Sequence, residues 1–159
     1  FCPPAQIHLR HRHVRSTCFI LSIPKLKERN QMSIFTHVVL GANDVAQSRK
    51  FYDATLAPLG VKNLGPMGEN AFLYGAQGPE FLITKPRDGK SACLANGGTI
   101  GFAASTRASV RAFHAAALAN GGTDEGAPGP RDFTPTAYAA YVRDPIGNKL
   151  CAYCFAPGE

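Results

Sequence analysis

The sequence has no long hydrophobic run. No apolar stretch in its 159 residues approaches the roughly 20 residues that a membrane-spanning helix needs, which excludes a helical membrane protein. Cysteine is also scarce, with five residues in all, of which Cys2 and Cys18 precede residue 32. An odd and scattered set does not make a disulfide framework, so the sequence predicts reduced thiols and a cytoplasmic location.

Histidines and phosphate-binding motifs are equally scarce. Only His37 and His114 follow residue 31, so no Ser-His-Asp triad can be assembled around them. The paired glycines at 97–98 and 121–122 lack the G-x-x-x-x-G-K-[ST] context of a phosphate-binding loop. Serine hydrolases of the triad type and P-loop proteins are therefore excluded.

Acidic residues are scarce at one end only. The formal net charge is +6, but residues 1–31 hold six Lys and Arg against one Glu, whereas residues 32–159 hold 11 against 10. A nearly neutral body does not predict nucleic-acid binding. We expect residues 1–31 to be a basic leader that is disordered or foreign to the protein, with Met32 as the true start; a genuine basic arm is the alternative. The folded domain is then expected over 32–159.

The body contains one internal repeat. Residues 37–61 read HVVLGANDVAQSRKFYDATLAPLGV and residues 99–123 read TIGFAASTRASVRAFHAAALANGGT, and eight of the 25 aligned pairs are identical at an offset of 62. A single duplication of this kind indicates two modules of the same fold. Neither module could bury both its helix and its sheet alone, so we expect them to pack around a pseudo-twofold axis. A two-sided ligand cleft is expected near that axis.

Each copy predicts one helix with a recognisable start and end. Polar N-cap candidates, Asn43-Asp44 and Ser105-Thr106, precede helices expected over 45–57 and 107–120. Glycines end both helices, because a C-cap favours a residue without a Cβ. In the second helix an apolar stripe recurs at i, i+3 and i+7, which predicts the face that packs on the core.

Strands flank each helix. The first strands are expected within residues 33–40 and 97–104, and the polar segment 85–96 is the expected linker. The modules then cover about 33–86 and about 97–156. The remaining strands are expected near 61–66, 70–75, 79–85, 123–128, 136–143 and 148–155.

Several stretches of the body resemble one known superfamily. They are THVVL with the following NDVAQSRKFYDATLAPLG, then AFHAAALANGG, GAPGPR and, most specifically, YAAYVRDPIGNKL. Across residues 33–155 the chain resembles the vicinal-oxygen-chelate superfamily of glyoxalases, bleomycin resistance proteins and extradiol dioxygenases. The resemblance implies an α+β fold of two βαβββ modules, whose eight strands form a U-shaped half-barrel. It also implies a homodimer and, in many members, a divalent metal inside the U.

The resemblance places four metal-ligand positions on this chain, at His37, Leu82 or a neighbour, Thr99 or a neighbour, and Cys151. Of these four, only His37 and Cys151 carry groups that can bind a metal. Metal-binding relatives commonly have histidine at the position of Thr99 and glutamate at the position of Cys151. A thiolate suits Zn(II), and Fe, Mn and Ni are the other metals to consider. The alternatives are an interior histidine and a buried, apolar thiol, or a nucleophilic Cys151 if His37 lowered its pKa.

Other side chains are candidates for the ligand pocket. Aromatic residues dominate both cores and pockets, so Tyr74, Phe102 and Tyr141 are expected in one or the other. Arg131, in the irregular PGPR loop, is either a clamp for an anionic substrate or a solvated loop arginine.

Two functions are open from the sequence. The first is a glyoxalase- or resistance-type cleft protein that acts on a small organic ligand, as a lyase, an isomerase or a dioxygenase with a degraded metal site. The second is a metal-free homodimer that binds or sequesters a small molecule without catalysis. The missing metal ligands favour binding over catalysis. The sequence identifies neither the catalytic residues nor the ligand.

Overall fold

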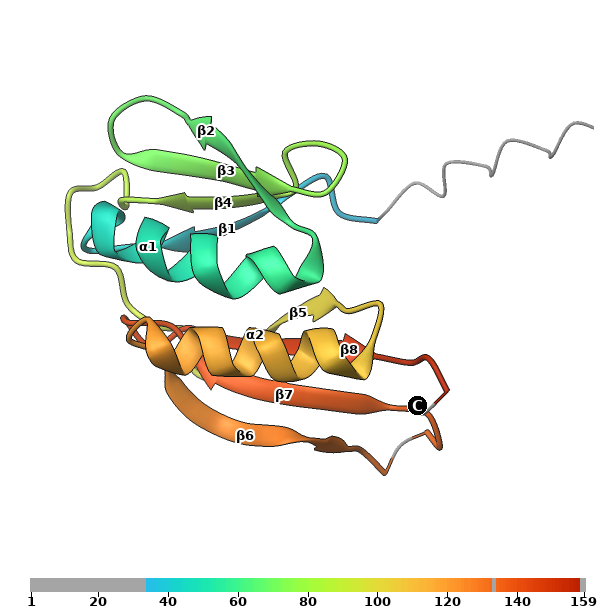
Figure 1. Ribbon diagram of the computed structural model, residues 1–159. Helices are drawn as coiled ribbons and strands as arrows, with labels where there is room; N and C mark the ends of the chain where they lie inside the picture. The colour runs from blue at the N-terminus through green and yellow to red at the C-terminus, as the bar shows by residue number, and fades with distance from the viewer. Residues whose placement is uncertain (1–33, 133, 158–159) are drawn as a thin grey trace, which may run out of the picture. The chain divides into compact units, whose positions relative to one another are not determined.

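The structure, a computed structural model, describes residues 34–132 and 134–157. The predicted leader over residues 1–31 lies outside the described residues. Within them the chain forms the two βαβββ modules expected from the repeat (Figure 1). Module 1 comprises β1 (Val38–Gly41), α1 (Val45–Leu56), the 3-10 turn η1 (Ala57–Leu59), β2 (Lys62–Pro66), β3 (Ala71–Gly75) and β4 (Phe81–Thr84). Module 2 comprises β5 (Ile100–Ala103), α2 (Arg107–Ala119), β6 (Thr123–Pro130), β7 (Tyr138–Arg143) and β8 (Lys149–Cys154).

The first strand of each module is shorter than predicted. β1 and β5 have four residues each, and β1 begins at Val38. The expected position of His37 within a strand is therefore wrong, because the residue precedes β1. The cause lies in the partner strand. The amide of Val38 donates to the carbonyl of Glu80 at 2.9 Å, but the amide of Glu80, which would continue the ladder, donates instead to the carbonyl of Tyr74 in β3 at 3.0 Å.

Side-chain caps start both helices where the sequence predicts them. The carboxylate of Asp44 accepts a hydrogen bond from the amide of Gln47 at 2.9 Å, and the hydroxyl of Thr106 accepts one from the amide of Ser109 at 3.0 Å. Each bond satisfies an amide that the first helical turn leaves unpaired. α1 continues into η1, and the chain then turns at Gly60, whose φ of 77° favours glycine.

The eight strands form two four-stranded sheets of the same topology. Their orders are β1-β4-β3-β2 and β5-β8-β7-β6, and in each sheet the first strand is parallel to the last while the other neighbours are antiparallel. Over residues 34–132 and 134–157, β1 and β5 are both edge strands and are not paired with each other. The predicted α+β fold of two βαβββ modules is confirmed, and its eight strands form two open sheets.

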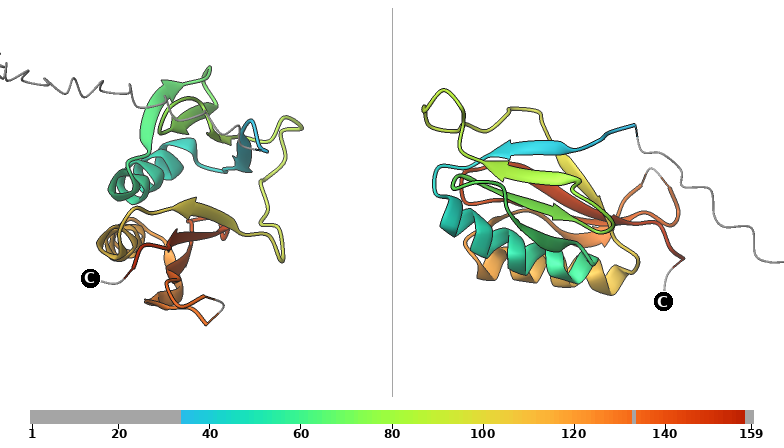
Figure 2. Two further views of the ribbon diagram at one scale, coloured as in Figure 1. Left: turned by 90° about the vertical axis from the view of Figure 1, so that its right-hand side faces the viewer. Right: turned by 90° about the horizontal axis from the view of Figure 1, so that it is seen from above.

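Both helices cover the same side of the two sheets, and one hydrophobic core lies between the helices and the sheets (Figures 1 and 2). A series of aromatic rings crosses this core between the modules. The ring centroids of Tyr52 and Phe81 are 5.3 Å apart, those of Phe81 and Phe102 are 5.3 Å apart, and those of Phe102 and Phe113 are 6.5 Å apart. The stripe predicted on α2 is fully buried in the core and consists of Val110, Phe113 and Ala117.

Among the described residues, no helix covers the opposite face of either sheet (Figure 2). Side chains alternate along a strand, so Val38 and Leu40 pack against the core while Val39 between them is 44% exposed. The same alternation exposes Gly101 and Ala103 of β5. We name the uncovered face of β1–β4 outer face 1 and that of β5–β8 outer face 2.

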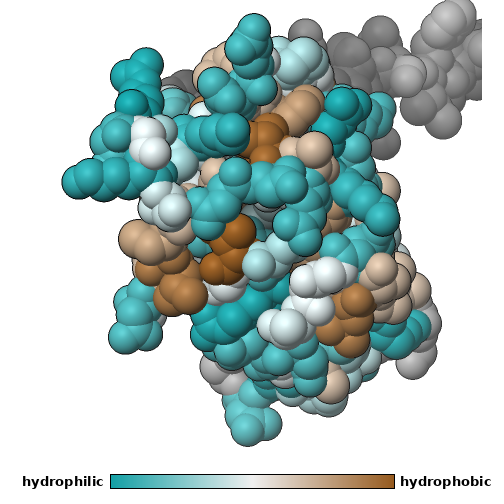
Figure 3. Space-filling view, turned by 90° about the vertical axis from the view of Figure 1, so that its left-hand side faces the viewer, coloured by the Kyte–Doolittle hydropathy of each residue, from teal (hydrophilic) through white to brown (hydrophobic). Residues whose placement is uncertain are grey.

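The surface on the linker side is largely hydrophilic, with scattered hydrophobic residues (Figure 3). Asn43 ties the linker to module 1, because its side chain accepts a hydrogen bond from the amide of Ala92 at 2.7 Å and donates one to the carbonyl of Ala92 at 3.3 Å. Neither helix of the described residues is long and apolar enough to cross a membrane.

Candidate functional site

Equivalent rows of residues cross the two outer faces. Row 1, on outer face 1, consists of Val39, Leu82, Leu73 and Gly65. Row 2, on outer face 2, consists of Gly101, Cys151, Tyr141 and Gly126. Leu82 and Cys151 hold matching places in the two rows, and both are metal-ligand positions that the family resemblance indicated. The same place in the duplicated fold therefore carries different chemistry in the two modules.

Outer face 1 is apolar. Val39 is 44% exposed, and Leu73 and Leu82 beside it in row 1 are half-buried. Leu64 in β2 and Met67 just after it are 46% and 51% exposed. None of the row 1 side chains offers a strong metal ligand or a hydrogen-bond donor, so row 1 can contribute apolar contact only.

A pair of tyrosines stands on outer face 2. The hydroxyls of Tyr141 in β7 and Tyr153 in β8 are hydrogen-bonded to each other, and their rings meet edge to face with centroids 5.9 Å apart. Phe155 stacks on Tyr153 with centroids 5.6 Å apart. Burial first, and then the hydrogen bond with Tyr141, raise the pKa of Tyr153 to about 12. Tyr153 therefore keeps its proton at neutral pH, and either hydroxyl of the pair can donate the hydrogen bond between them.

Three cations and one carboxylate surround the tyrosine pair. The guanidinium of Arg131 lies 5.4 Å and the ammonium of Lys149 lies 5.2 Å from the centroid of the Tyr141 ring. Glu125 forms ion pairs with Arg143 and with Lys149, the latter at 3.2 Å. Arg131, which directly follows β6 and not a loop as the sequence suggested, donates to two backbone carbonyls of β6 at 3.0 and 3.1 Å, and no described carboxylate pairs with it. The group therefore has a net positive charge.

Cys151 lies next to Tyr141 in row 2 and is only 4% exposed. Burial raises the pKa of its thiol to about 11, against the opposing effect of the Lys149 charge. The protonated thiol lacks the lowered pKa of a reactive or metal-binding cysteine. A Cβ on Gly101 would lie 3.4 Å from the sulfur, so the glycine keeps β5 free of a side chain directly beside it.

A hollow of about 480 Å³ opens beside the tyrosine pair. Gly101 and Ala103 line it on β5, opposite Cys151 and Tyr153 in the strand register, and Phe155 stands at its side. The hollow exists because the two outward residues of β5 are too small to fill it. Its size suits a small organic molecule, for which protein pockets typically measure roughly 300–1,000 Å³.

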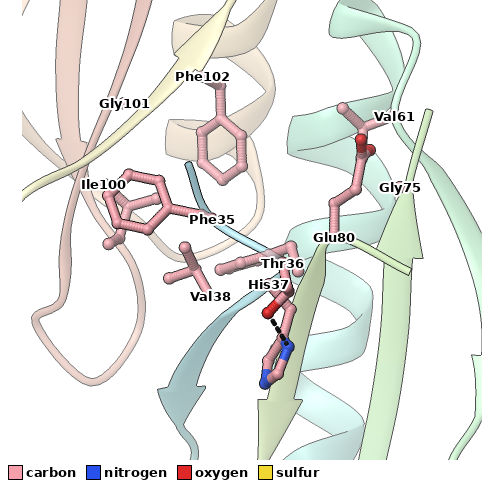
Figure 4. Close-up of a pocket in the computed structure, with 11 residues that line it drawn as sticks. Phe35, Thr36, His37, Val38, Val61, Gly75, Glu80, Ile100, Gly101 and Phe102 are labelled. Carbon is pink, nitrogen blue, oxygen red and sulfur yellow. Dashed lines mark hydrogen bonds between the residues drawn. The ribbon is translucent and has the colours of Figure 1, made fainter. Parts of the chain in front are cut away.

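His37 lies at a different cavity, of about 210 Å³, between the first residues of β1 and β5 (Figure 4). Val38, Ile100 and Phe102 give this cavity apolar walls. The imidazole Nδ1 of His37 is 3.1 Å from the hydroxyl of Thr36, and the ring points away from Ile100 and Phe102. His37 is exposed.

The structure places the remaining predicted site residues apart from one another. Thr99 is exposed and precedes β5, as His37 precedes β1. Phe102 lines both the cavity and the hollow. Tyr74 reaches neither, because it faces α1 in the core and is fully buried, with its hydroxyl donating to Asp53 at 3.0 Å. Burial and the neighbouring Asp53 carboxylate hold the pKa of Tyr74 well above its ordinary value.

The residues present do not fit a metal within one chain. Two of the four indicated positions, Leu82 and Thr99, offer no strong ligand. The other two come from different modules, since His37 precedes β1 and Cys151 is in β8. Across the described part of the chain, no three His, Cys, Asp or Glu side chains come together as a metal site requires.

Sequence reasoning does not identify Lys149 and Glu125 as neighbours of Tyr141. The position of Lys149 could be found from the DPIGN turn, because that turn places Arg143 opposite Lys149 and Tyr141 opposite Cys151. The position of Glu125 could not, because the β6–β7 pairing contains two register shifts. Each shift breaks the alternation on which a sequence pattern depends.

Comparison with known protein families identifies the chain. The model of the Glyoxalase/Bleomycin resistance protein/Dioxygenase superfamily matches residues 34–152. The chain therefore belongs to this superfamily, as its sequence stretches indicate. Comparison with curated proteins gives no significant match.

Solved structures share the fold. A crystal structure of a glyoxalase/bleomycin resistance protein from Albidiferax ferrireducens T118 is 45% identical, covers 77% of this chain and 98% of its own, and has a TM-score of 0.70. The lactoylglutathione lyase from Agrobacterium tumefaciens is 18% identical, with coverages of 77% and 94% and a TM-score of 0.51. The fosfomycin resistance protein FosX from Mesorhizobium loti is 11% identical, with coverages of 79% and 94% and a TM-score of 0.56. The last two show the fold alone.

Proposed function

We propose that this protein binds a small organic ligand on its outer sheet faces and does so without metal chemistry. The observation that carries the proposal is the tyrosine pair Tyr141–Tyr153, which stands with its cations beside a hollow of suitable size. Aromatic walls with a few fixed polar groups are the usual composition of a small-molecule site. Leu82 and Thr99, at family metal positions, support binding over metal-assisted catalysis.

A metal-dependent lyase or dioxygenase is the other activity that the superfamily suggests. Such an enzyme would have to use His37, which precedes β1 of one sheet, and Cys151, which is in β8 of the other sheet. It would also have to deprotonate a thiol whose pKa is raised to about 11. No carboxylate base stands at the position where the family has one, because Cys151 occupies it. The donor set therefore supports the binding function better.

A second copy of the chain is the partner that we propose for the outer faces. Single exposed hydrophobic residues are ordinary, but Val39 and Leu64 belong to the same sheet, Met67 directly follows it, and no helix of the described residues covers outer face 1. A twofold pair of chains can place outer face 1 of one copy across from outer face 2 of the other, which would close a cleft over the tyrosine pair.

The described cysteines are all free, which supports the predicted cytoplasmic location.

A ligand screen with and without chelation tests the binding function. The full-length protein is treated with EDTA and screened against a library of small organic compounds by ligand-observed NMR, beside untreated protein. We expect the same compounds to bind to both samples. Elemental analysis of the untreated wild type and of a His37→Ala variant should show no stoichiometric metal that is present in the wild type and absent from the variant. Binding that disappears on chelation, together with a metal lost in His37→Ala, would establish a metal site instead. A screen without any binder in either sample would contradict the binding function itself.

A further inference from the structure

We propose that the ligand of outer face 2 is a small organic anion, whose carboxylate, phosphate or phosphonate group is held by Arg131 and Tyr141. This inference rests on the proposed binding function and adds the chemical class of the ligand. It depends on the charge of Arg131, on the hydroxyl of Tyr141 and on the apolar hollow beside the tyrosine pair.

Arg131 is a preorganised cation without a counter-ion. Its two terminal nitrogens donate to the carbonyls of Pro130 at 3.0 Å and Ala127 at 3.1 Å, which hold the guanidinium beside the Tyr141 ring. A guanidinium has five N–H donors, so donors remain for a ligand. Among the described residues no carboxylate neutralises the charge. A fixed guanidinium of this kind matches the planar fork of an oxyanion.

The tyrosine pair supplies a second donor. Two hydroxyls that share one hydrogen bond use only one of their two protons for it. Either hydroxyl can be the donor of that bond, and we assign Tyr153 as the donor. The O–H of Tyr141 is then the proton left for a ligand. The charge of Arg131 also acts on Tyr153, so the guanidinium and the hydroxyl pair lie close enough to act on one group.

The surroundings define the rest of the ligand. Gly101 and Ala103 leave the hollow beside Tyr153 open, and Phe155, which is 54% exposed, offers an aromatic surface along it. A short, flat apolar body fits such a hollow, with the anionic group directed toward Arg131. The ligand is therefore an organic oxyanion with an aromatic or similarly flat apolar body, and an inorganic ion would leave the hollow unused.

Glu125 limits the positive charge of the site. It neutralises one of the three cations around the tyrosine pair through its ion pairs with Arg143 and Lys149. Removing its charge should therefore strengthen the binding of an anion. This expectation gives the proposal a gain of affinity to test, which misfolding of a variant cannot imitate.

Calorimetric titration with probes of one size and different charge tests the proposal. The anionic probes are benzoate and phenylphosphonate, and the neutral probes are benzamide and benzyl alcohol, each titrated into the full-length protein at low salt. We expect the anionic probes to bind more tightly and added salt to weaken them. Arg131→Gln should weaken their binding about tenfold and Tyr141→Phe about threefold to tenfold. Glu125→Gln should tighten it severalfold.

Matched controls separate the site from the rest of the surface. Arg87→Gln removes an exposed cation of the linker, and Tyr138→Phe removes a hydroxyl from the core-facing side of the same strand as Tyr141. Both should bind the anionic probes as the wild type does. Circular dichroism confirms that each variant is folded before it is titrated.

Three outcomes would overturn the proposal. Neutral probes that bind as tightly as anionic ones would refute the ligand class while leaving the binding function intact. Anionic binding that is unchanged in Arg131→Gln and Tyr141→Phe would refute the site. Absence of binding by all four probes would also refute the proposal, and the compound screen described above then decides separately whether the binding function fails with it.

Discussion

The hydroxyl of Tyr52 in α1 donates a 2.7 Å hydrogen bond to the carboxylate of Asp144, in the turn between β7 and β8. Asp144 is only 4% exposed, and the amides of Ile146 and Asn148 also donate to it. A buried carboxylate needs such donors, because burial removes its hydrating water. Tyr52 and Asp144 are 92 residues apart and belong to different modules, so this bond links the two halves of the domain.

Tyr52→Phe should lower the free energy of unfolding by about 1.5–3 kcal/mol, because it removes a hydrogen bond to a buried charge and leaves the ring in place. Urea denaturation with fluorescence or circular dichroism detection measures the loss. Tyr138→Phe is the control, because the ring that Arg107 contacts at 5.2 Å is retained and no hydrogen bond to a charge is removed. Equal stability of Tyr52→Phe and wild type would contradict a linking role for Tyr52.

Phe113→Ala should destabilise the whole domain. Phe113 is fully buried in the core that both modules share, so truncation leaves a cavity and should cost about 3–5 kcal/mol. Leu118→Ala, on the same helix but 42% exposed, should change stability by less than about 0.5 kcal/mol. Chemical denaturation compares the two variants. A second, separate unfolding transition in Phe113→Ala would show that the modules do not share one core.

Stability in acid should depend on Glu125. The hydrogen bonds from Arg143 and then Lys149 hold the pKa of Glu125 below its ordinary value of 4.5. The resulting stabilisation is fully present above pH 4.5 and disappears as the pH falls through the lower folded-state pKa, because the unfolded chain takes up the proton first. Glu125→Gln should therefore differ from wild type most at neutral pH.

Thermal melting over this pH range, at low and at high salt, measures the effect of Glu125→Gln. The difference from wild type should shrink in acid, and it should shrink with salt because the ion pairs are partly exposed. A difference that stays constant from neutral to acid pH would mean that the substitution acts through packing and not through charge.

Cys151 should react slowly with iodoacetamide at neutral pH. Its thiol is 4% exposed and has a pKa of about 11, whereas Cys93 in the linker is exposed and serves as the internal reference. Timed labelling followed by peptide mass spectrometry should show Cys151 modified at least about tenfold more slowly. Labelling of Cys151 as fast as Cys93 would contradict a buried, protonated thiol and would favour the metal-thiolate alternative.

Val39→Lys should weaken self-association, because it places a charge in row 1 on the apolar outer face 1. The side chain is 44% exposed within one chain, so the substitution should leave the fold intact. Size-exclusion chromatography with light scattering should show a dimer for wild type and a shift toward monomer for the variant. Leu118→Lys, at a position 42% exposed on α2, is the control. A dimer that Val39→Lys leaves unchanged would show that the interface does not include outer face 1.

Local signals predicted most of the fold. The N-caps Asp44 and Thr106 and the turn glycine Gly60 fix where the helices begin and the chain turns, and α2 ends within one residue of its predicted end. Such signals act over a few residues and are legible in the sequence. The length of β1 could not be predicted from its own residues, because it depends on where the partner strand begins, near Glu80.

The site could be predicted only in part. Arg131 and Tyr141 are individually recognisable, but their contact depends on register shifts between β6 and β7 that no pattern shows. The repeat does not predict the hydrogen bond between Tyr52 and Asp144. The residue equivalent to Tyr52 in α2 is His114, which bonds instead to Asp124 of its own module at 2.8 Å. Equivalent positions thus acquired different partners after duplication, and only the packed structure shows which.

The strands of this domain carry core residues on one face and the residues of the proposed binding surface on the other. The residues that hold the fold together point toward the helices, and the residues of rows 1 and 2 point the other way. Natural selection can therefore alter the outward residues, and with them the preferred molecule, while the core that keeps the protein folded stays the same. A duplicated scaffold of this kind is free to specialise each half separately, one as an apolar wall and the other as a charged wall, without first gaining stability to compensate.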